Sequence, residues 1–109
     1  MTPNQVNEAA IYKALGDPIR LEIVKRLAAK STCTIGELST NLGVSRQGAR
    51  KQLQVLVDAD IVILEQRGRQ TDVSLNKHSL QVARDFIAQL ERQWDNRLEA
   101  LKKYVEESD

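Results

Sequence analysis

A cluster of hydrogen-bond donors without a carboxylate lies between residues 43 and 57. On a helix, at about 100° per residue, these donors would cover roughly 140° of the circumference, opposite an apolar stripe of Ala49, Leu53 and Leu56. The donors are Arg46, Gln47, Arg50, Lys51 and Gln54. Arginine and lysine bind guanine O6 and N7, glutamine pairs with adenine, and the cations neutralise phosphate. Such a face suits the major groove of DNA, and an ordinary solvated face is the alternative.

Two further cations, Arg67 and Arg69, lie in a glycine-containing segment, 66–70. Short β-favouring segments at 61–65 and 71–75 flank it, which predicts a β-hairpin with both arginines at its tip. An exposed tip has no core to stabilise, so its natural ligands are the phosphate backbone and the narrow minor groove. Tip charges that only aid solubility are the alternative.

Helix-capping signals predict the elements that would position these side chains. Thr2 and Pro3 begin a first helix, which Gly16 ends in a left-handed conformation, and Asp17 caps a second. The second helix is expected to bury Ile23 and its apolar neighbours.

A third and a fourth helix follow close together. Thr34 and Glu37 form a capping box for a short helix that ends at Gly43, and Ser45 caps a helix over 46–59. Two short helices joined by a tight glycine-containing turn are typical of a helix-turn-helix. Ser45 stands at the start of the donor-rich helix, and we count it among the expected DNA contacts.

The last segment, 79–106, has apolar residues at alternating steps of three and four, which predicts one amphipathic helix of about 40 Å. These residues are Leu80, Ala83, Ile87, Leu90, Trp94, Leu98, Leu101 and Val105. The remainder of so small a chain cannot cover a stripe of this length, so we expect a second copy to cover it.

Length and composition predict one domain over 1–109, mainly α-helical with a small β-hairpin. The net charge of +1 and a pI near 7.9 fall short of the usual nucleic-acid binder. The charge is segregated, however, since seven of the fifteen acids follow residue 76. No apolar run is long enough for a membrane and no leader is recognisable, so we expect a cytoplasmic protein.

The lone Cys33 and the lone His78 leave little scope for catalysis or metal binding. Without a second thiol, Cys33 is best interpreted as a small buried residue, and we expect His78 in a surface loop. No nucleophile and base pair, and no glycine-rich phosphate loop, can be assembled from the chain. We therefore expect neither an enzyme nor a cofactor.

Six short segments carry a resemblance to a known family. They are Ala14–Val24, Glu37-Leu38, Ser45-Arg46-Gln47, Lys51–Leu56, Asp60-Ile61-Val62 and Arg67-Gly68-Arg69. Together they resemble the ArsR family of winged helix-turn-helix repressors over nearly the whole chain, and Trp94–Leu98 resembles one subgroup of it. The resemblance implies a homodimer through the first and last helices, the fourth helix as reader and the hairpin as wing. The interface residues expected on that basis are Val6, Ala10, Leu90, Trp94, Leu98, Leu101 and Val105.

The chain departs from the metal-sensing members of that family. Alignment on Glu37 places Thr34 and Gly36 where those members have their paired thiolates, and Cys33 lies one residue away. A soft-metal site needs two or three thiolates, and His78 precedes the helix that would carry a zinc site. The sequence therefore predicts no metal site.

These features predict a transcriptional regulator that binds double-stranded operator DNA and represses its own or neighbouring genes. The alternative is a winged helix that docks a protein and binds no DNA, but the acid-free face and the wing arginines favour DNA. An inducer stays unidentified: Phe86, Trp94 and Tyr104 fit plain interface packing better than a small-molecule pocket.

Overall fold

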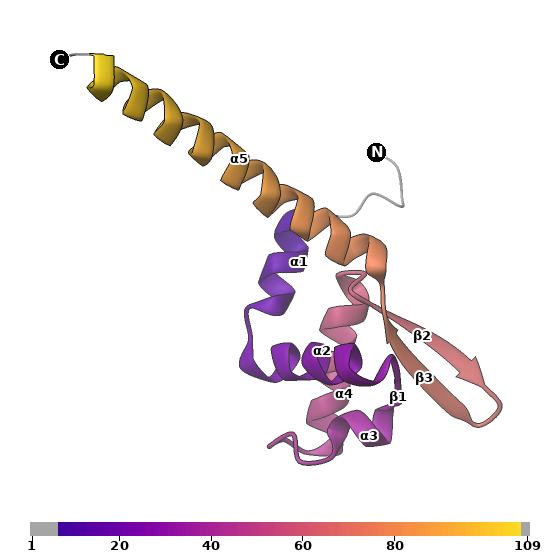
Figure 1. Ribbon diagram of the computed structural model, residues 1–109. Coiled ribbons are helices and arrows are strands. Elements are labelled where there is room, and N and C mark those ends of the chain that lie inside the picture. Colours follow the sequence, from indigo (N-terminus) through magenta and orange to yellow (C-terminus); the bar gives the residue numbers. More distant parts are fainter. Residues whose placement is uncertain (1–6, 108–109) are drawn as a thin grey trace.

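The computed structural model describes residues 7–107, which form five helices and a small three-stranded sheet. The elements are α1 (Glu8–Leu15), α2 (Pro18–Lys30), β1 (Thr32–Thr34), α3 (Ile35–Ser39), α4 (Arg46–Asp58), β2 (Val62–Arg67), β3 (Gln70–Leu75) and α5 (Lys77–Glu107). Helices α1 to α4 form the body, the β2–β3 hairpin projects from one side of it, and α5 runs away from its top (Figure 1). The arrangement is a winged helix-turn-helix, as predicted.

Polar side chains start α2, α3 and α4 where the capping signals predict. One carboxylate oxygen of Asp17 accepts from the backbone N–H groups of Ile19 and Arg20, at 2.8 and 3.1 Å. Thr34 and Glu37 form the capping box, and the Ser45 hydroxyl accepts from the Gly48 N–H at 3.0 Å. Each cap satisfies donors that the first helical turn leaves without partners.

The first helix ends at Leu15, as predicted, but its start and the conformation of Gly16 differ from the prediction. It begins at Glu8 after an Asn7 cap, and the predicted start at Thr2 and Pro3 lies outside the described residues. The prediction of a left-handed Gly16 is wrong, because its φ is −83°. A Cβ at Gly16 would stand only 3.3 Å from the carbonyl oxygen of Tyr12, so close backbone approach is what favours glycine there.

The sheet contains one strand that the sequence did not reveal. The hairpin forms with Val62 opposite Leu75 and Arg67 opposite Gln70, so its turn is tighter than predicted, with Gly68 at φ +63°. β1 adds to the other side of β3, giving the order β1-β3-β2. Three residues that end in a helix cap have no periodicity of their own, which is why β1 went unseen.

The core joins all these elements except most of α5. Its least exposed side chains, at 0 to 1%, are Ile11, Ile23, Leu27, Leu56, Ile61 and Val73. The start of α5 is fastened to this core: the Ser79 hydroxyl donates to the Asp60 carbonyl, and the Tyr12 hydroxyl donates to that of Ala83. Tyr12 also packs against Phe86, with ring centroids 5.8 Å apart.

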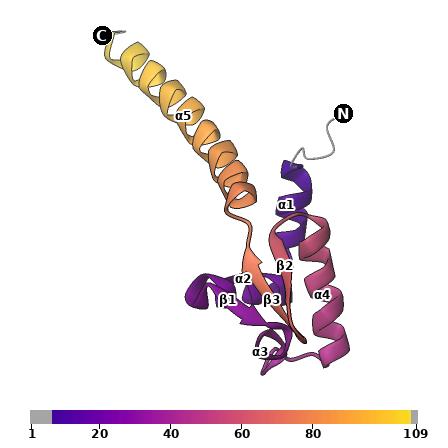
Figure 2. The same ribbon diagram turned by 90° about the vertical axis from the view of Figure 1, so that its right-hand side faces the viewer.

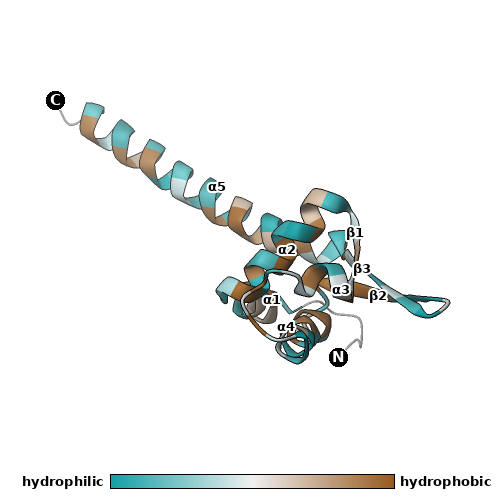
Figure 3. Cartoon of the chain, turned by 90° about the horizontal axis from the view of Figure 1, so that it is seen from below, coloured by the Kyte–Doolittle hydropathy of each residue, from teal (hydrophilic) through white to brown (hydrophobic). Residues whose placement is uncertain are grey.

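Beyond this attachment, α5 leaves the body as an isolated rod (Figure 2). It starts two residues earlier than predicted, so the exposed His78 lies in its first turn and the prediction of a loop histidine is wrong. Hydrophobic and hydrophilic residues alternate along the rod (Figure 3). No helix within 7–107 is long and apolar enough to cross a membrane.

Candidate nucleic-acid interface

The donor-rich face of α4 points to solvent, as the predicted stripe requires. Ala49, Leu53 and Leu56 are 4, 5 and 0% exposed, and they seat the helix on the core. The opposite face is exposed at all five donor positions, which are Arg46, Gln47, Arg50, Lys51 and Gln54. The five donors therefore lie on one exposed surface of one helix, and Ser45 is exposed at its N-terminal end.

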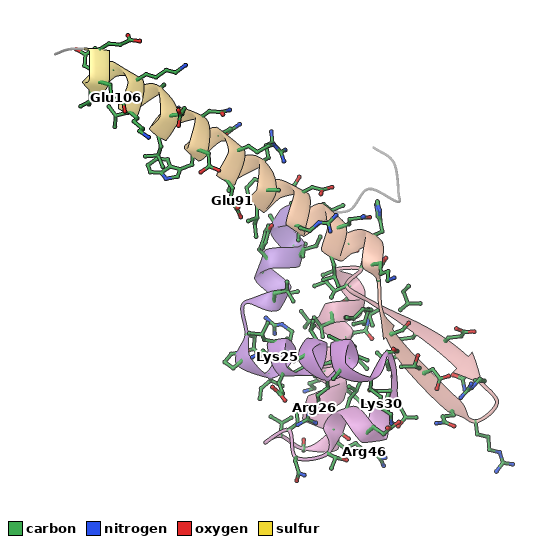
Figure 4. The ribbon with its side chains drawn as sticks, in the orientation of Figure 1. Lys25, Arg26, Lys30, Arg46, Glu91 and Glu106 are labelled. Carbon is green, nitrogen blue, oxygen red and sulfur yellow. The ribbon has the colours of Figure 1, made fainter. Side chains whose placement is uncertain are left out.

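An arginine that the sequence analysis missed fixes the turn that leads into α4. The guanidinium of Arg26, on α2, donates to the backbone carbonyls of Leu38, Thr40 and Asn41. These carbonyls lie at the end of α3 and in the turn that leads to α4, and Figure 4 places Arg26 between α2 and α3. The planar fork of a guanidinium suits several carbonyls at once. Arg26 thus fixes the turn in the helix-turn-helix.

We expect Arg26→Ala to lower the free energy of unfolding by about 1–3 kcal/mol, because three backbone carbonyls lose a charged donor. Arg26→Lys should recover little of this, since one ammonium cannot reproduce the fork. Thermal and urea melts measure the effect. Lys25→Ala is the matched control on the same helix, because Lys25 is exposed, and it should melt like the wild type. Equal melts for Arg26→Ala and Lys25→Ala would contradict the assignment.

A hollow of about 300 Å³ separates the start of α4 from the wing. Three guanidinium groups line it, from Arg46 and Arg50 on α4 and from Arg69 at the wing tip, and no acidic residue does. None of these three arginines forms an ion pair or a side-chain hydrogen bond with another residue in 7–107. The structure therefore brings three of the eight expected contact residues, from distant parts of the chain, to one place.

Two of the expected contacts have partners within the chain. Arg67 Nε lies 3.1 Å from a carboxylate oxygen of Asp72, on the opposite face of the hairpin from Thr71. The Gln54 side-chain amide donates to Asp58 at 2.8 Å, one turn further along α4. The Arg67 side chain is 73% exposed although that of Asp72 is only 14% exposed, so the guanidinium stays accessible from solvent.

The only cysteine is buried at 4% exposure, beside the α3 capping box. Burial raises the pKa of the Cys33 thiol, and the neighbouring Glu37 carboxylate raises it further. The protonated form is therefore favoured at neutral pH, which suits a packing role. Within the described range 7–107, no three histidine, cysteine or acidic side chains lie close enough together to hold a metal ion.

The apolar stripe of α5 is exposed over four turns of the rod. Leu90, Trp94, Leu98 and Leu101 are 48, 61, 47 and 59% exposed, and Val105 follows at 58%. At about 100° per residue, the stripe from 87 to 105 occupies only about 80° of the helix circumference. Of the other interface residues expected, Ala10 is half-buried on α1 and Val6 lies outside the described residues.

Comparisons with known proteins agree with this geometry. A helix-turn-helix domain family matches residues 15–65, which include the whole of α2, α3 and α4. YuzN of Bacillus subtilis (strain 168), an HTH-type transcriptional regulator, is 34% identical over 80 residues, or 68% of this chain and 87% of YuzN.

Solved structures extend the likeness over most of the chain. An ArsR-like transcriptional regulator from Rhodococcus sp. RHA1 is 29% identical, with a TM-score of 0.76 over 88% of this chain and 90% of that one. The transcriptional repressor BigR from Xylella fastidiosa is 26% identical, with a TM-score of 0.58 over 73% of this chain and 82% of that one.

Proposed function

Because this chain belongs to the ArsR family of winged helix-turn-helix, DNA-binding transcriptional regulators, we propose that it represses its own or neighbouring genes by occupying operator DNA. The observation that carries the proposal is the exposed donor face of α4, whose Arg46 and Arg50 line one hollow together with Arg69 of the wing. Such a surface neutralises phosphates while it presents donors to base edges. BigR, a neighbour in fold, is itself described as a repressor.

We further propose that the operator-binding form is a homodimer joined along α5. An apolar stripe on a rod that leaves the body costs free energy in water, and an identical stripe on a second copy can cover it. Two-fold symmetry would then present two α4 helices to half-sites about 34 Å apart, one turn of DNA. Occupied in this way, an operator near a promoter is closed to polymerase.

A salt titration tests DNA binding itself. Binding of the purified protein to a random-sequence duplex should weaken linearly on a log–log plot as salt rises, because each neutralised phosphate releases counterions. Absence of salt-dependent binding would favour a winged helix that docks a protein. Sequencing the DNA fragments that the protein retains would then identify the operator.

We expect zinc and arsenite to leave DNA binding unchanged. Thr34 and Gly36 occupy the positions of the paired thiolates in metal-sensing members, and neither side chain can supply a thiolate. Gel-shift or anisotropy titrations with and without one equivalent of each metal measure this, with a chelator as the control. Release of DNA at stoichiometric metal would contradict the prediction.

A further inference from the structure

The hollow between α4 and the wing has the composition of an anion site. Arg46, Arg50 and Arg69 line it together with the hydroxyl-bearing Thr34 and Thr71, and no carboxylate is present. Other arginines of the body and the wing have partners: Arg20 and Arg26 donate to backbone carbonyls, and Arg67 pairs with Asp72. Guanidinium groups that converge without a counterion repel one another, and a bound anion relieves that repulsion.

The start of α3 leaves room for one of these groups. Gly36 lies beneath the Arg46 guanidinium, and a Cβ at this position would be 3.2 Å from Nη2 of Arg46. Arg46 is the first residue of α4, immediately after the Ser45 cap. Its side chain therefore lies at the end of α4 that borders the hollow. Arg69 reaches the same hollow from the wing turn.

We propose that this hollow holds one phosphate of the DNA backbone, gripped by Arg46 and Arg69 together. The inference rests on the proposed function and adds that the helix and the wing share a single phosphate. Guanidinium groups bind phosphate oxygens through paired N–H donors, so one arginine on each side makes a clamp. Arg50 lines the hollow one turn further along α4, and with the phosphate clamped there it would contact the neighbouring base.

A double-variant cycle on a random-sequence duplex tests the sharing. Arg46→Ala and Arg69→Ala should each lower the slope of log affinity against log salt by about one, the value for one phosphate. Because either substitution releases the same phosphate, the double variant should also lower the salt slope by only about one. Its affinity should lie within about twofold of that of the weaker single variant.

The control pair is Lys51→Ala with Arg69→Ala. Lys51 does not line the hollow, so this pair should lower the slope by about two. A slope lowered by about two in the Arg46 and Arg69 double variant would overturn the shared clamp while leaving DNA binding intact. A wild-type protein that binds no duplex would instead overturn the proposed function.

Thermal melts in inorganic phosphate and in chloride, at equal ionic strength, distinguish a backbone phosphate from a free one. Phosphate raises melting temperatures in general, so an equal rise for the wild type and the double variant would support the backbone as the source. If the melting temperature of the wild type rises in phosphate and the double variant lacks this rise, the hollow binds a free anion and the clamp is overturned. All variants should melt together in chloride, since Arg46 and Arg69 are exposed.

Discussion

Leu98→Asp should turn the protein into a monomer at micromolar concentration and weaken its binding to operator DNA. Leu98 is 47% exposed in the single chain and lies in the α5 stripe, where dimer formation would bury it. An unpaired carboxylate in such a seam should weaken the dimer by up to about 4 kcal/mol, or roughly a thousandfold in the dissociation constant. Sedimentation equilibrium and light scattering measure the mass directly.

Asn96→Asp is the matched control for this experiment. It introduces the same charge into the same helix, but at about 100° per residue position 96 lies on the opposite side of α5 from the stripe. This variant should remain dimeric and bind DNA as the wild type does. If the wild type is itself a monomer at micromolar concentration, the proposed interface is wrong, whatever Leu98→Asp does.

Arg50→Ala should cost about 1–3 kcal/mol on operator DNA and relax the preference at one base position in each half-site. Arg50 and Gln47 lie in the first two turns of α4 and away from its buried stripe, where a recognition helix comes nearest to base edges. We therefore expect these two residues to read sequence.

Arg69→Ala should have a different signature, because Arg69 stands on the wing turn beside the hollow. With Arg46, Lys51 and Arg67, it is expected to bind phosphates or the minor groove and so to set affinity. The variant should weaken operator and scrambled duplexes alike and lower the salt slope by about one. Parallel titrations of both variants with both duplexes, across a salt series, compare the roles. The assigned roles would be reversed if Arg50→Ala weakened binding to both duplexes equally while Arg69→Ala erased the preference for the operator.

The sequence alone determined the features that depend on neighbouring residues. The Asp17, Thr34 and Ser45 caps form bonds within three residues of themselves, and their geometry repeats wherever such residues precede a helix. The exposed face of α4 follows equally from the 3.6-residue period, because burying Ala49, Leu53 and Leu56 turns the arginines outward. The two strands of the hairpin followed from a glycine-containing turn between β-favouring segments.

Only the tertiary structure decided what distant residues do to one another. Arg26 binds a carbonyl 15 residues away, β1 pairs with a strand about forty residues further along, and Arg46 meets Arg69 at one hollow. Arg67 and Arg69 look equivalent in sequence, yet one pairs with Asp72 and the other has no counterion within 7–107. Such contacts depend on how whole elements pack, and no local spacing encodes that packing. The same packing ends before the middle of α5, so Leu90, Trp94, Leu98 and Leu101 remain about half exposed in the single chain.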